Sequence, residues 1–332
     1  MEKDISMQLT EQVMQEILSE FYLDNEFSLL GDFENFVYEV SRDGTPFILR
    51  ISHSSHRTKE NLISELDWMG HLFEKSLPVP QVLESKSREK VIKVQAGDGS
   101  FFFGCLYTKA KGGPVQVRSE DFKEPLFEVW GRTIGKMHNV TKSYTPPKSI
   151  QPRPSWQEDD LLQFGHYYPV HEKELVKKAE DLVETISSFP VNHETFGLVH
   201  SDLHAGNFFY DKKQINVFDF DDSAYHWFAS DMAIPVYYSV LYGIPATQQE
   251  KRNAFARRFL ASFIKGYEME NTLPACWQKQ LPYFFRLRDV VLYSVLHKKI
   301  AVENRSKEVN ALLDEIRTRI REKEPIVTIG AH

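Results

Sequence analysis

One polar segment, enclosed by short apolar strands, constrains this chain more than any other part of the sequence. Its eight residues, 200–207, read His-Ser-Asp-Leu-His-Ala-Gly-Asn, and the apolar strand 208–210 follows at once. A second apolar strand, 215–218, leads directly into Asp219. Because two antiparallel strands joined by a short turn form a hairpin, we expect Asp219 to return close to Asn207.

The side chains of Asp202, Asn207 and Asp219 suit the chemistry of phosphoryl transfer. A carboxylate and an amide oxygen are hard ligands for Mg²⁺, and a further carboxylate can accept a proton from an attacking hydroxyl. A zinc site at His200 and His204 is a poorer interpretation, because the other ligands would be Asp and Asn and the motif contains no cysteine. Solvated acids on an ordinary hairpin would explain any one residue, but the combined set favours a site.

The first third of the chain has the patterns of a sheet and two covering helices. Apolar residues at helical spacing predict one opening helix over 5–21. The strands 36–40 and 46–51 are joined by Asp43-Gly44, which is a strong hairpin signal. The turn at 30–35 could cover phosphates with backbone amides, although a plain hairpin is the better interpretation of that turn alone.

Two further features of this third could serve a nucleotide. Arg50 at a strand end and Glu65 on the predicted helix 58–75 could pair and so position a cation on phosphates, although they could also be unrelated surface charges. After the strands 91–94 and 101–107, an adenine ring could hydrogen-bond to exposed backbone groups. The candidates are Leu106, Tyr107 and Thr108, and a plain domain linker explains the composition equally well.

The remainder of the chain has helical periodicity. The fold class is therefore α+β with two lobes and a cleft between them. We expect an N-terminal nucleotide-binding lobe at 1–108, a hinge at 109–114 and a helical catalytic and substrate-binding lobe at 115–325. The predicted helices are 119–138, capped by Ser119, and 172–187, 232–242, 249–267, 277–300 and 307–321.

Composition excludes several classes of protein. The net charge of −7 argues against a general nucleic-acid binder. No apolar stretch is long enough to span a bilayer, and the N-terminal residues do not resemble a signal peptide, so a cytoplasmic location is expected. The two cysteines, Cys105 and Cys276, are expected to be buried free thiols. The oligomeric state is left open.

The polar motif resembles that of a known family. The run 200–207 is similar to the H-G-D-x-H-x-x-N loop of the aminoglycoside phosphotransferase and choline kinase family, and 218–221 resembles its I-D-[FW]-[DE] strand end. The resemblance extends over about 27–300. It implies a protein-kinase-like fold and the transfer of phosphate from ATP, with Mg²⁺, to a hydroxyl of a small molecule.

The resemblance also implies roles for individual residues. Asp202 would be the catalytic base, Asn207 and Asp219 the Mg²⁺ ligands, and Arg50 the phosphate-facing cation with Glu65 as its partner. Asp231 resembles the family's buried aspartate that braces the catalytic loop. The sequence departs from the family pattern at Ser201, where glycine is usual, and at Arg50, where many kinases have lysine.

The short span between Asp219 and Asp231 favours a small-molecule acceptor over a protein, because a peptide groove needs a long segment there and Ala-Pro-Glu is absent. Acids could hold an amine of the acceptor, and arginines could hold a carboxylate. An amino alcohol, an amino acid such as homoserine, and an amino sugar all remain open. The candidate acceptor-binding residues, each of which could instead be salt-bridged within its lobe, are Asp221, Asp222, Tyr225, His226, Tyr238, Arg286 and Arg288.

Two other classes of protein compete with the kinase interpretation. A metal-dependent hydrolase would need further acid or His ligands in the first lobe, and the sequence contains no such cluster there. A catalytically weak or inactive nucleotide-binding scaffold would be expected to lack Asp202, Asn207 or Asp219, and all three are present.

Overall fold

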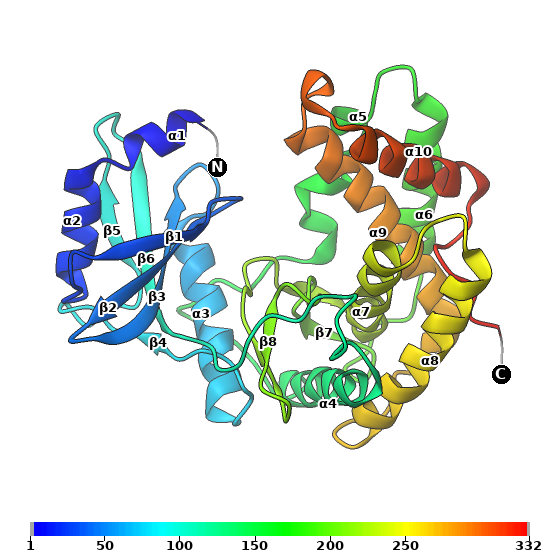
Figure 1. Ribbon diagram of the computed structural model, residues 1–332, viewed down its shortest axis with the longest axis horizontal. Coiled ribbons are helices and arrows are strands. Elements are labelled where there is room, and N and C mark those ends of the chain that lie inside the picture. The colour runs from blue at the N-terminus through cyan, green and yellow to red at the C-terminus, as the bar shows by residue number, and fades with distance from the viewer. Residues whose placement is uncertain (1–2, 331–332) are drawn as a thin grey trace. The chain divides into compact units, whose positions relative to one another are not determined.

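The chain forms two compact units in the computed structural model, which describes residues 3–330 (Figure 1). The first unit contains the residues up to Gly112 together with Tyr144–Arg153 and Asn216–Asp221. The second contains Gly113–Ser143, Pro154–Ile215 and the chain from Asp222 onward. A six-stranded sheet in the first unit and long helices in the second confirm the α+β class. The exact lobe boundaries stay a prediction.

The sheet of the first unit is antiparallel in every pairing between its strands, and its order is β1-β2-β3-β6-β4, with β5 also paired to β6. At the turn between β2 and β3, both Asp43 (φ 50°) and Gly44 (φ 74°) are left-handed, as a type I′ turn requires. The predicted Asp-Gly hairpin is therefore confirmed. The strands are β1 Phe27–Gly31, β2 Phe36–Arg42, β3 Thr45–His53, β4 Val82–Leu83, β5 Ile92–Gln95 and β6 Phe101–Thr108.

One face of this sheet packs on an N-terminal helix. Ile17 and Leu18 of α2 (Glu11–Glu20) share a buried apolar cluster with Leu49 and Ile51 of β3. The predicted single opening helix is wrong, because α1 (Lys3–Gln8) ends before Thr10. The Thr10 hydroxyl accepts a hydrogen bond from Val13 N at 3.3 Å and so begins a new helix.

The opposite face of β3 carries the side chain of Arg50. Because side chains alternate along a strand, Arg50 points away from Leu49 and Ile51. It meets the helix α3 (Lys59–Glu74), which begins at a capping box formed by Thr58 and Asn61. The predicted helix at 58–75 is thus confirmed to within one residue at each end.

The second unit consists mainly of helices, with short strands among them. Two of these, β7 (Phe196–Val199) and β10 (Ala224–Trp227), pair in a small sheet. The hairpin of β8 (Phe208–Tyr210) and β9 (Ile215–Val217) lies where the chain passes from the second unit into the first, because Ile215 belongs to the second unit and Asn216 to the first. The α-helices are α4 Glu124–Thr141, α5 Phe164–Tyr167, α6 Lys173–Ser187, α7 Phe228–Gly243, α8 Gln249–Glu268, α9 Trp277–Lys299 and α10 Lys307–Glu322. Short 3₁₀ turns occur at Trp156–Glu158, Asp160–Leu162 and Val302–Asn304.

Two local predictions in this unit are wrong. Ser119 does not cap a helix, since α4 begins only at Glu124, next to Pro125, whose ring favours the first helical turn. Cys276 is exposed rather than buried, and it lies at the N-cap of α9 with a left-handed backbone (φ 63°). Cys105 on β6 is buried, as predicted.

The helices α4 and α8 touch through their backbones. A Cβ atom placed on Gly131 would lie 1.8 Å from the carbonyl oxygen of Phe263, and one placed on Gly266 would lie 1.8 Å from that of Glu128. Only glycine fits such a close approach on both helices. This contact sets the spacing at which Tyr267 of α8 reaches His138 of α4.

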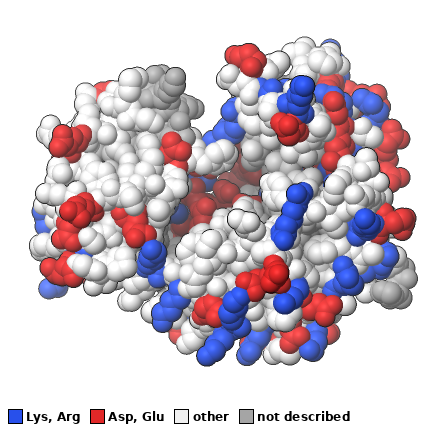
Figure 2. Space-filling view, in the orientation of Figure 1, with Lys and Arg blue, Asp and Glu red and all other residues white. Residues whose placement is uncertain are grey.

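The surface of each unit carries both signs of charge. On the face shown in Figure 2, Lys and Arg side chains are interspersed with Asp and Glu. Within residues 3–330, no helix combines the length and the apolarity needed to cross a bilayer.

The glycine contact between α4 and α8 can be tested by adding one methyl group. We expect Gly266→Ala to destabilise the protein by about 1–3 kcal/mol or more, because the backbone of α4 must move away. The matched control is Gly70→Ala in α3, where a Cβ meets open space and alanine should be neutral or stabilising by about 0.5–1 kcal/mol. Urea denaturation measures both. Equal stability of the two variants would contradict the close approach.

Candidate active site

A buried carboxylate holds the loop 200–207 in place. Oδ1 of Asp231, on α7, accepts a hydrogen bond from Ser201 N at 2.9 Å. Its other oxygen lies 3.0 Å from Nε2 of His138, whose Nδ1 lies 2.9 Å from the hydroxyl of Tyr267. Asp231 and His138 are fully buried. The hydrogen bond from Ser201 N is a direct contact between Asp231 and the loop, as the bracing role implied by the resemblance requires.

The residue held by this carboxylate has an unusual backbone. Ser201 adopts a left-handed conformation with φ 69°, which costs a residue with a Cβ on the order of 1 kcal/mol. This conformation accounts for the glycine usual at this position of the motif. In this chain residue 201 is a serine, and the hydrogen bond from its backbone nitrogen to Asp231 stabilises the left-handed conformation.

The carboxylate of Asp202 is contacted on both oxygens. Oδ1 accepts a hydrogen bond from Nη2 of Arg288 at 3.0 Å, and Oδ2 lies 3.4 Å from Nε2 of His204. Burial alone would raise the pKa of Asp202, but the hydrogen bond with His204 and the charge of Arg288 outweigh it and lower that pKa below its usual value. Asp202 is therefore ionised at neutral pH, as a proton acceptor must be.

A cluster of aromatic rings begins beside the arginine that contacts Asp202. The Arg288 guanidinium lies 5.1 Å from the ring centre of Tyr238 and donates a hydrogen bond to its hydroxyl. The ring of Tyr242 stacks on that of Tyr238 at 5.6 Å, and His204 meets Tyr238 edge to face. Tyr242 is 53% exposed, so this cluster presents an accessible aromatic surface. Tyr238 is among the residues expected from the sequence to bind an acceptor, whereas Tyr242, one helical turn further on, is not.

Asn207 is oriented by the same loop. Its amide nitrogen donates a hydrogen bond to the backbone oxygen of Asp202 at 2.9 Å, so its amide oxygen is the atom that points elsewhere. Asp219 belongs to the first unit, is exposed and has a left-handed backbone (φ 65°). The contact between Asp202 and Asn207 is thus observed, whereas the convergence of Asp219 on them stays a prediction.

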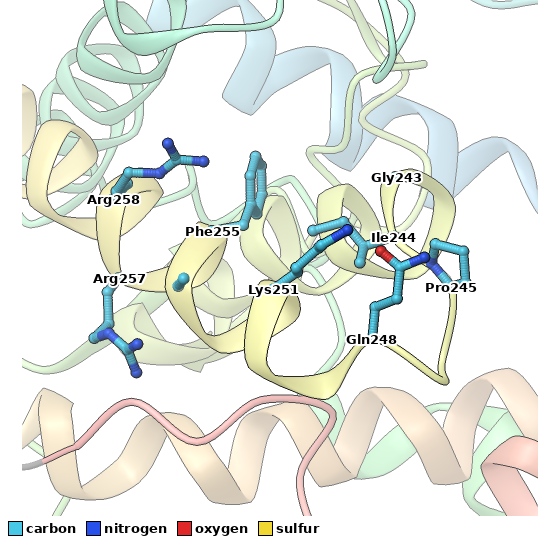
Figure 3. A pocket seen from close by; sticks show the side chains of 9 residues that line it. Gly243, Ile244, Pro245, Gln248, Lys251, Phe255, Arg257 and Arg258 are labelled. Atoms are coloured by element: carbon cyan, nitrogen blue, oxygen red, sulfur yellow. The ribbon is translucent and has the colours of Figure 1, made fainter.

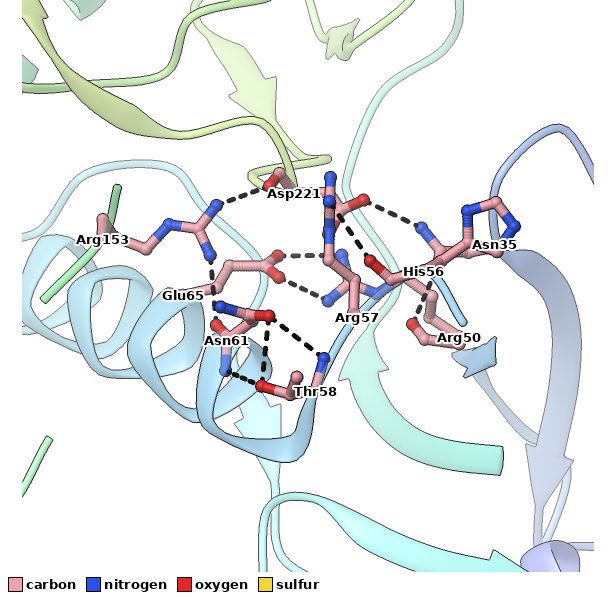
Figure 4. A network of polar contacts seen from close by, with 10 residues as sticks. Asn35, Arg50, His56, Arg57, Thr58, Asn61, Glu65, Arg153 and Asp221 are labelled. Atoms are coloured by element: carbon pink, nitrogen blue, oxygen red, sulfur yellow. Dashed lines mark hydrogen bonds and ion pairs between the residues drawn. The ribbon is translucent and has the colours of Figure 1, made fainter. Parts of the chain in front are cut away.

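Arg50 and Glu65 form the expected pair within the first unit (Figure 4). Two parallel hydrogen bonds, of 2.8 Å and 2.6 Å, join the guanidinium to the carboxylate, and both side chains are buried. The guanidinium lies 5.5 Å from the ring centre of Tyr107. Burial raises the pKa of the neighbouring Cys105 thiol to about 12, so this thiol stays neutral beside the arginine.

The residues expected to bind adenine lie on a strand in the interior of the sheet. Leu106 and Tyr107 of β6 pair with β3 on one side and β4 on the other. Thr108 N donates a hydrogen bond to the Gln81 carbonyl oxygen at 2.9 Å. Backbone groups of this strand are therefore already engaged by neighbouring strands. The backbone that follows Thr108 is the better candidate for an adenine contact.

Asp221 has a different environment from the one expected of an acceptor-binding residue (Figure 4). It is 7% exposed, and its carboxylate accepts hydrogen bonds from Arg57 at 2.9 Å and Asn35 at 3.3 Å. Its backbone oxygen accepts one from Arg153 at 2.5 Å. Asp221 is therefore salt-bridged within its own unit, which was the alternative to a role in acceptor binding. Nothing in the sequence pattern marked Arg57, Asn35 or Arg153, because their partner is distant along the chain.

The two arginines on α9 do not act together. Two positions apart on a helix, Arg286 and Arg288 point in opposite directions. Arg288 contacts Asp202, whereas Arg286 lines a small cavity with residues of α6 and α10 and lies 5.8 Å from the ring centre of Tyr283. Arg286 is therefore not brought to Asp202. Asp222 is exposed, and Tyr225 is partly buried on β10.

His226, also considered as an acceptor-binding residue, is buried among aromatic rings. Its ring centre lies 5.1 Å from that of Trp156 and 5.5 Å from that of Phe284. Nδ1 accepts a hydrogen bond from Trp227 N at 2.8 Å, which requires an unprotonated nitrogen. Burial lowers the pKa of His226 to about 3. This environment is that of a core histidine rather than of a ligand-binding one.

A surface pocket of about 580 Å³ lies elsewhere in the second unit (Figure 3). Its walls come from the end of α7 and from α8, and Lys251, Arg257 and Arg258 contribute its charged groups. Among the described residues, its lining does not include Asp202 or Arg288. We therefore place the chemistry at the loop 200–207 and not in this pocket.

Comparison with known proteins agrees with the chemistry of the site. The profile described as "Phosphotransferase enzyme family" matches residues 28–276. Together, fold and site define a small-molecule kinase with a protein-kinase-like architecture. The chain belongs to the phosphotransferase enzyme family, which confirms the resemblance seen in the motif.

Individual relatives cover nearly the whole chain. Amicoumacin kinase of Bacillus subtilis (strain 168) is 34% identical over 317 residues, which are 95% of this chain and 93% of that protein. A structure of amicoumacin kinase hAmiN in complex with AMP-PNP, Ca²⁺ and Ami is 30% identical, with a TM-score of 0.93 and coverage of 99% and 98%. A microcompartment-associated aminopropanol kinase shares the fold at 21% identity and a TM-score of 0.74, with coverage of 94% and 95%.

These matches establish the reaction class. The chain is an enzyme that transfers a phosphoryl group from ATP to a hydroxyl of a small molecule and uses a divalent metal ion. The inactive-scaffold alternative has no support in them.

The buried His226 makes stability depend on pH. In the unfolded chain a histidine has a pKa near 6.5, whereas His226 has a pKa of about 3 in the folded state, so only the unfolded state gains this proton between these values. Protonation of this residue therefore has little effect on the free energy of unfolding above pH 6.5. As the pH falls below this value, the free energy of unfolding decreases, and at pH 5 the decrease due to this residue is about 2 kcal/mol.

Urea denaturation at pH 7.5 and pH 5 measures this loss. We expect His226→Gln to be less stable at pH 7.5 but to lose less stability on acidification. The control Phe284→Leu removes a ring contact with His226 but no titratable group, and should keep the pH dependence of the unmodified protein. A pH dependence in His226→Gln equal to that of the unmodified protein would rule out this origin.

Proposed function

We propose that this chain phosphorylates amicoumacin or a chemically similar acceptor, with Asp202 as the catalytic base. The observation that carries the acceptor assignment is the similarity to amicoumacin kinases over almost the entire chain, including the unit that contains Asp202. The oxygen of the acceptor hydroxyl forms a bond to the γ-phosphorus of ATP, the bond to the β-phosphate oxygen breaks, and Asp202 takes the hydroxyl proton.

The environment of Asp202 supports its role as base. Arg288 and His204 keep its carboxylate ionised and fix its direction. The accessible ring of Tyr242, stacked on Tyr238, supplies a surface against which an acceptor can lie while its hydroxyl approaches Asp202. Arg288 is thus assigned to Asp202, and not to a carboxylate of the acceptor.

The donor set fits a divalent metal ion. Asn207 and Asp219 are the proposed ligands, because both offer hard oxygen atoms and the amide nitrogen of Asn207 is already engaged by the loop. Mg²⁺, when bound, neutralises charge on the phosphates of ATP. Arg50, held by both oxygens of Glu65, is the proposed cation for those phosphates, and its planar group can contact a phosphate oxygen while remaining paired.

We also propose a cytoplasmic location, because the reaction consumes ATP as its phosphoryl donor. The backbone following Thr108 is proposed to contact adenine, in place of Leu106 and Tyr107, which lie inside the sheet. The adenine contact depends on the nucleotide-binding role of the first unit.

Release of ADP across a panel of acceptors tests the proposal. Amicoumacin should be turned over with the highest kcat/KM, and aminopropanol, homoserine and an amino sugar serve as comparison acceptors. Asp202→Ala should lower kcat by about 10²–10⁴-fold while Mg²⁺ and AMP-PNP still bind. Faster turnover of a comparison acceptor would overturn the acceptor assignment, and unchanged turnover in Asp202→Ala would remove it as the base.

The pairing of Arg288 with Asp202 predicts a change in the pH–rate profile. Without the guanidinium, burial raises the pKa of Asp202, so in Arg288→Gln the acid limb of kcat/KM should move to higher pH. Tyr238→Phe removes the hydroxyl that Arg288 contacts but keeps its charge, and should shift the limb less. An acid limb that stays in place in Arg288→Gln would contradict the pairing.

A further inference from the structure

Asp221 is the point where three separate segments of the first unit meet (Figure 4). Its Oδ1 accepts a hydrogen bond from Nε of Arg57, in the connection between β3 and α3. Its Oδ2 accepts one from the amide of Asn35, at the end of the turn that joins β1 to β2. Its backbone oxygen accepts one from Arg153, which also binds the backbone oxygen of Asn61 on α3.

Each of these partners is itself fixed. The amide oxygen of Asn35 accepts a hydrogen bond of 2.6 Å from Ser52 on β3, and both side chains are buried. Arg57 is followed by Thr58, whose capping box begins α3. Asp221 therefore contacts a rigid frame, and the position of its backbone is determined by the sheet and by α3.

Asp219 lies only two residues before this anchor. Phe220, between them, is fully buried and packs edge to face on Trp68 of α3, with ring centres 5.4 Å apart. The exposed, left-handed Asp219 is thus held by two consecutive anchored residues that follow it. A short segment with a strained backbone keeps its direction only when such neighbours determine it.

We propose that Asp221 and Arg57 are positioning residues that set the direction of the Asp219 carboxylate toward a divalent metal ion. The inference rests on the proposed function, in which Asp219 is a metal ligand. A separate hydrogen bond, from the amide of Asn35 to Asp221, ties the turn 30–35 to the segment that carries the metal ligand. Asp221 itself does not contact the acceptor, because its side chain is 9% exposed and its carboxylate is paired with Arg57.

Metal-dependent nucleotide binding tests this without turnover. The affinity for AMP-PNP, measured by calorimetry at increasing Mg²⁺, gives the Mg²⁺ concentration for half-maximal binding. We expect Asp221→Asn and Arg57→Gln each to raise this concentration about 10-fold, as loss of outer-sphere partners of metal ligands does. The double variant should be no weaker than either single one, because both remove the same ion pair.

Two further variants separate this inference from the proposed function. Lys59→Gln, at the first residue of α3, removes a partly exposed ion pair with Glu89 and should leave Mg²⁺ dependence unchanged. Asp219→Asn should abolish the response to Mg²⁺, and a normal response would refute the metal assignment of the proposed function.

Other outcomes bear on the inference alone. If Asp219→Asn loses the response but Arg57→Gln matches Lys59→Gln, the positioning role is wrong. Additive effects in the double variant would also overturn it, since Asp221 would then act independently of Arg57. Arg57 is partly exposed, so Arg57→Gln keeps the test decisive even if Asp221→Asn does not fold.

Discussion

The buried carboxylate of Asp231 is the interaction on which the catalytic loop depends. A charged group without access to water must find partners for both oxygens, and here these are a backbone amide of the loop and a histidine of α4. The His138 partner connects in turn to Tyr267 on α8, at a distance that the glycine contact between the two helices determines. Burial lowers the pKa of His138 despite the nearby carboxylate, so the ring stays neutral and the network keeps one fixed arrangement of protons.

Elements with strong local signals could be predicted from the sequence. The Asp43-Gly44 turn and the helix capped by Thr58 depend on a few adjacent residues, and the structure matches them closely. The motif 200–207 identified the reaction for the same reason. Local signals failed where a competing one was stronger, as at Ser119, where Pro125 determines the beginning of α4 instead. Thr10 divided a continuous apolar pattern into two helices by capping the second.

Side-chain partners that are distant along the chain could not be predicted in this way. The assignment of Asp221 to an acceptor depended on its neighbour Asp222, whereas its actual partner, Arg57, precedes it by 164 residues. Arg286 and Arg288 looked alike in sequence, yet their positions on α9 send them to opposite sides. The pair Arg50 and Glu65 was predictable because strand alternation and the following helix constrain both residues.

The two cysteines differ in exposure, so they also differ in reactivity toward thiol reagents, a property that has no part in phosphoryl transfer. Thiol reagents attack the thiolate, and the buried Cys105, with a pKa of about 12, supplies almost none of it at neutral pH. Cys276 is exposed at the beginning of α9, the helix that carries Arg288. Since the chain has only these two cysteines, a fluorescent or spin label can be attached to the helical unit of the natural sequence at a single place. Such a label would report on α9 while an acceptor binds.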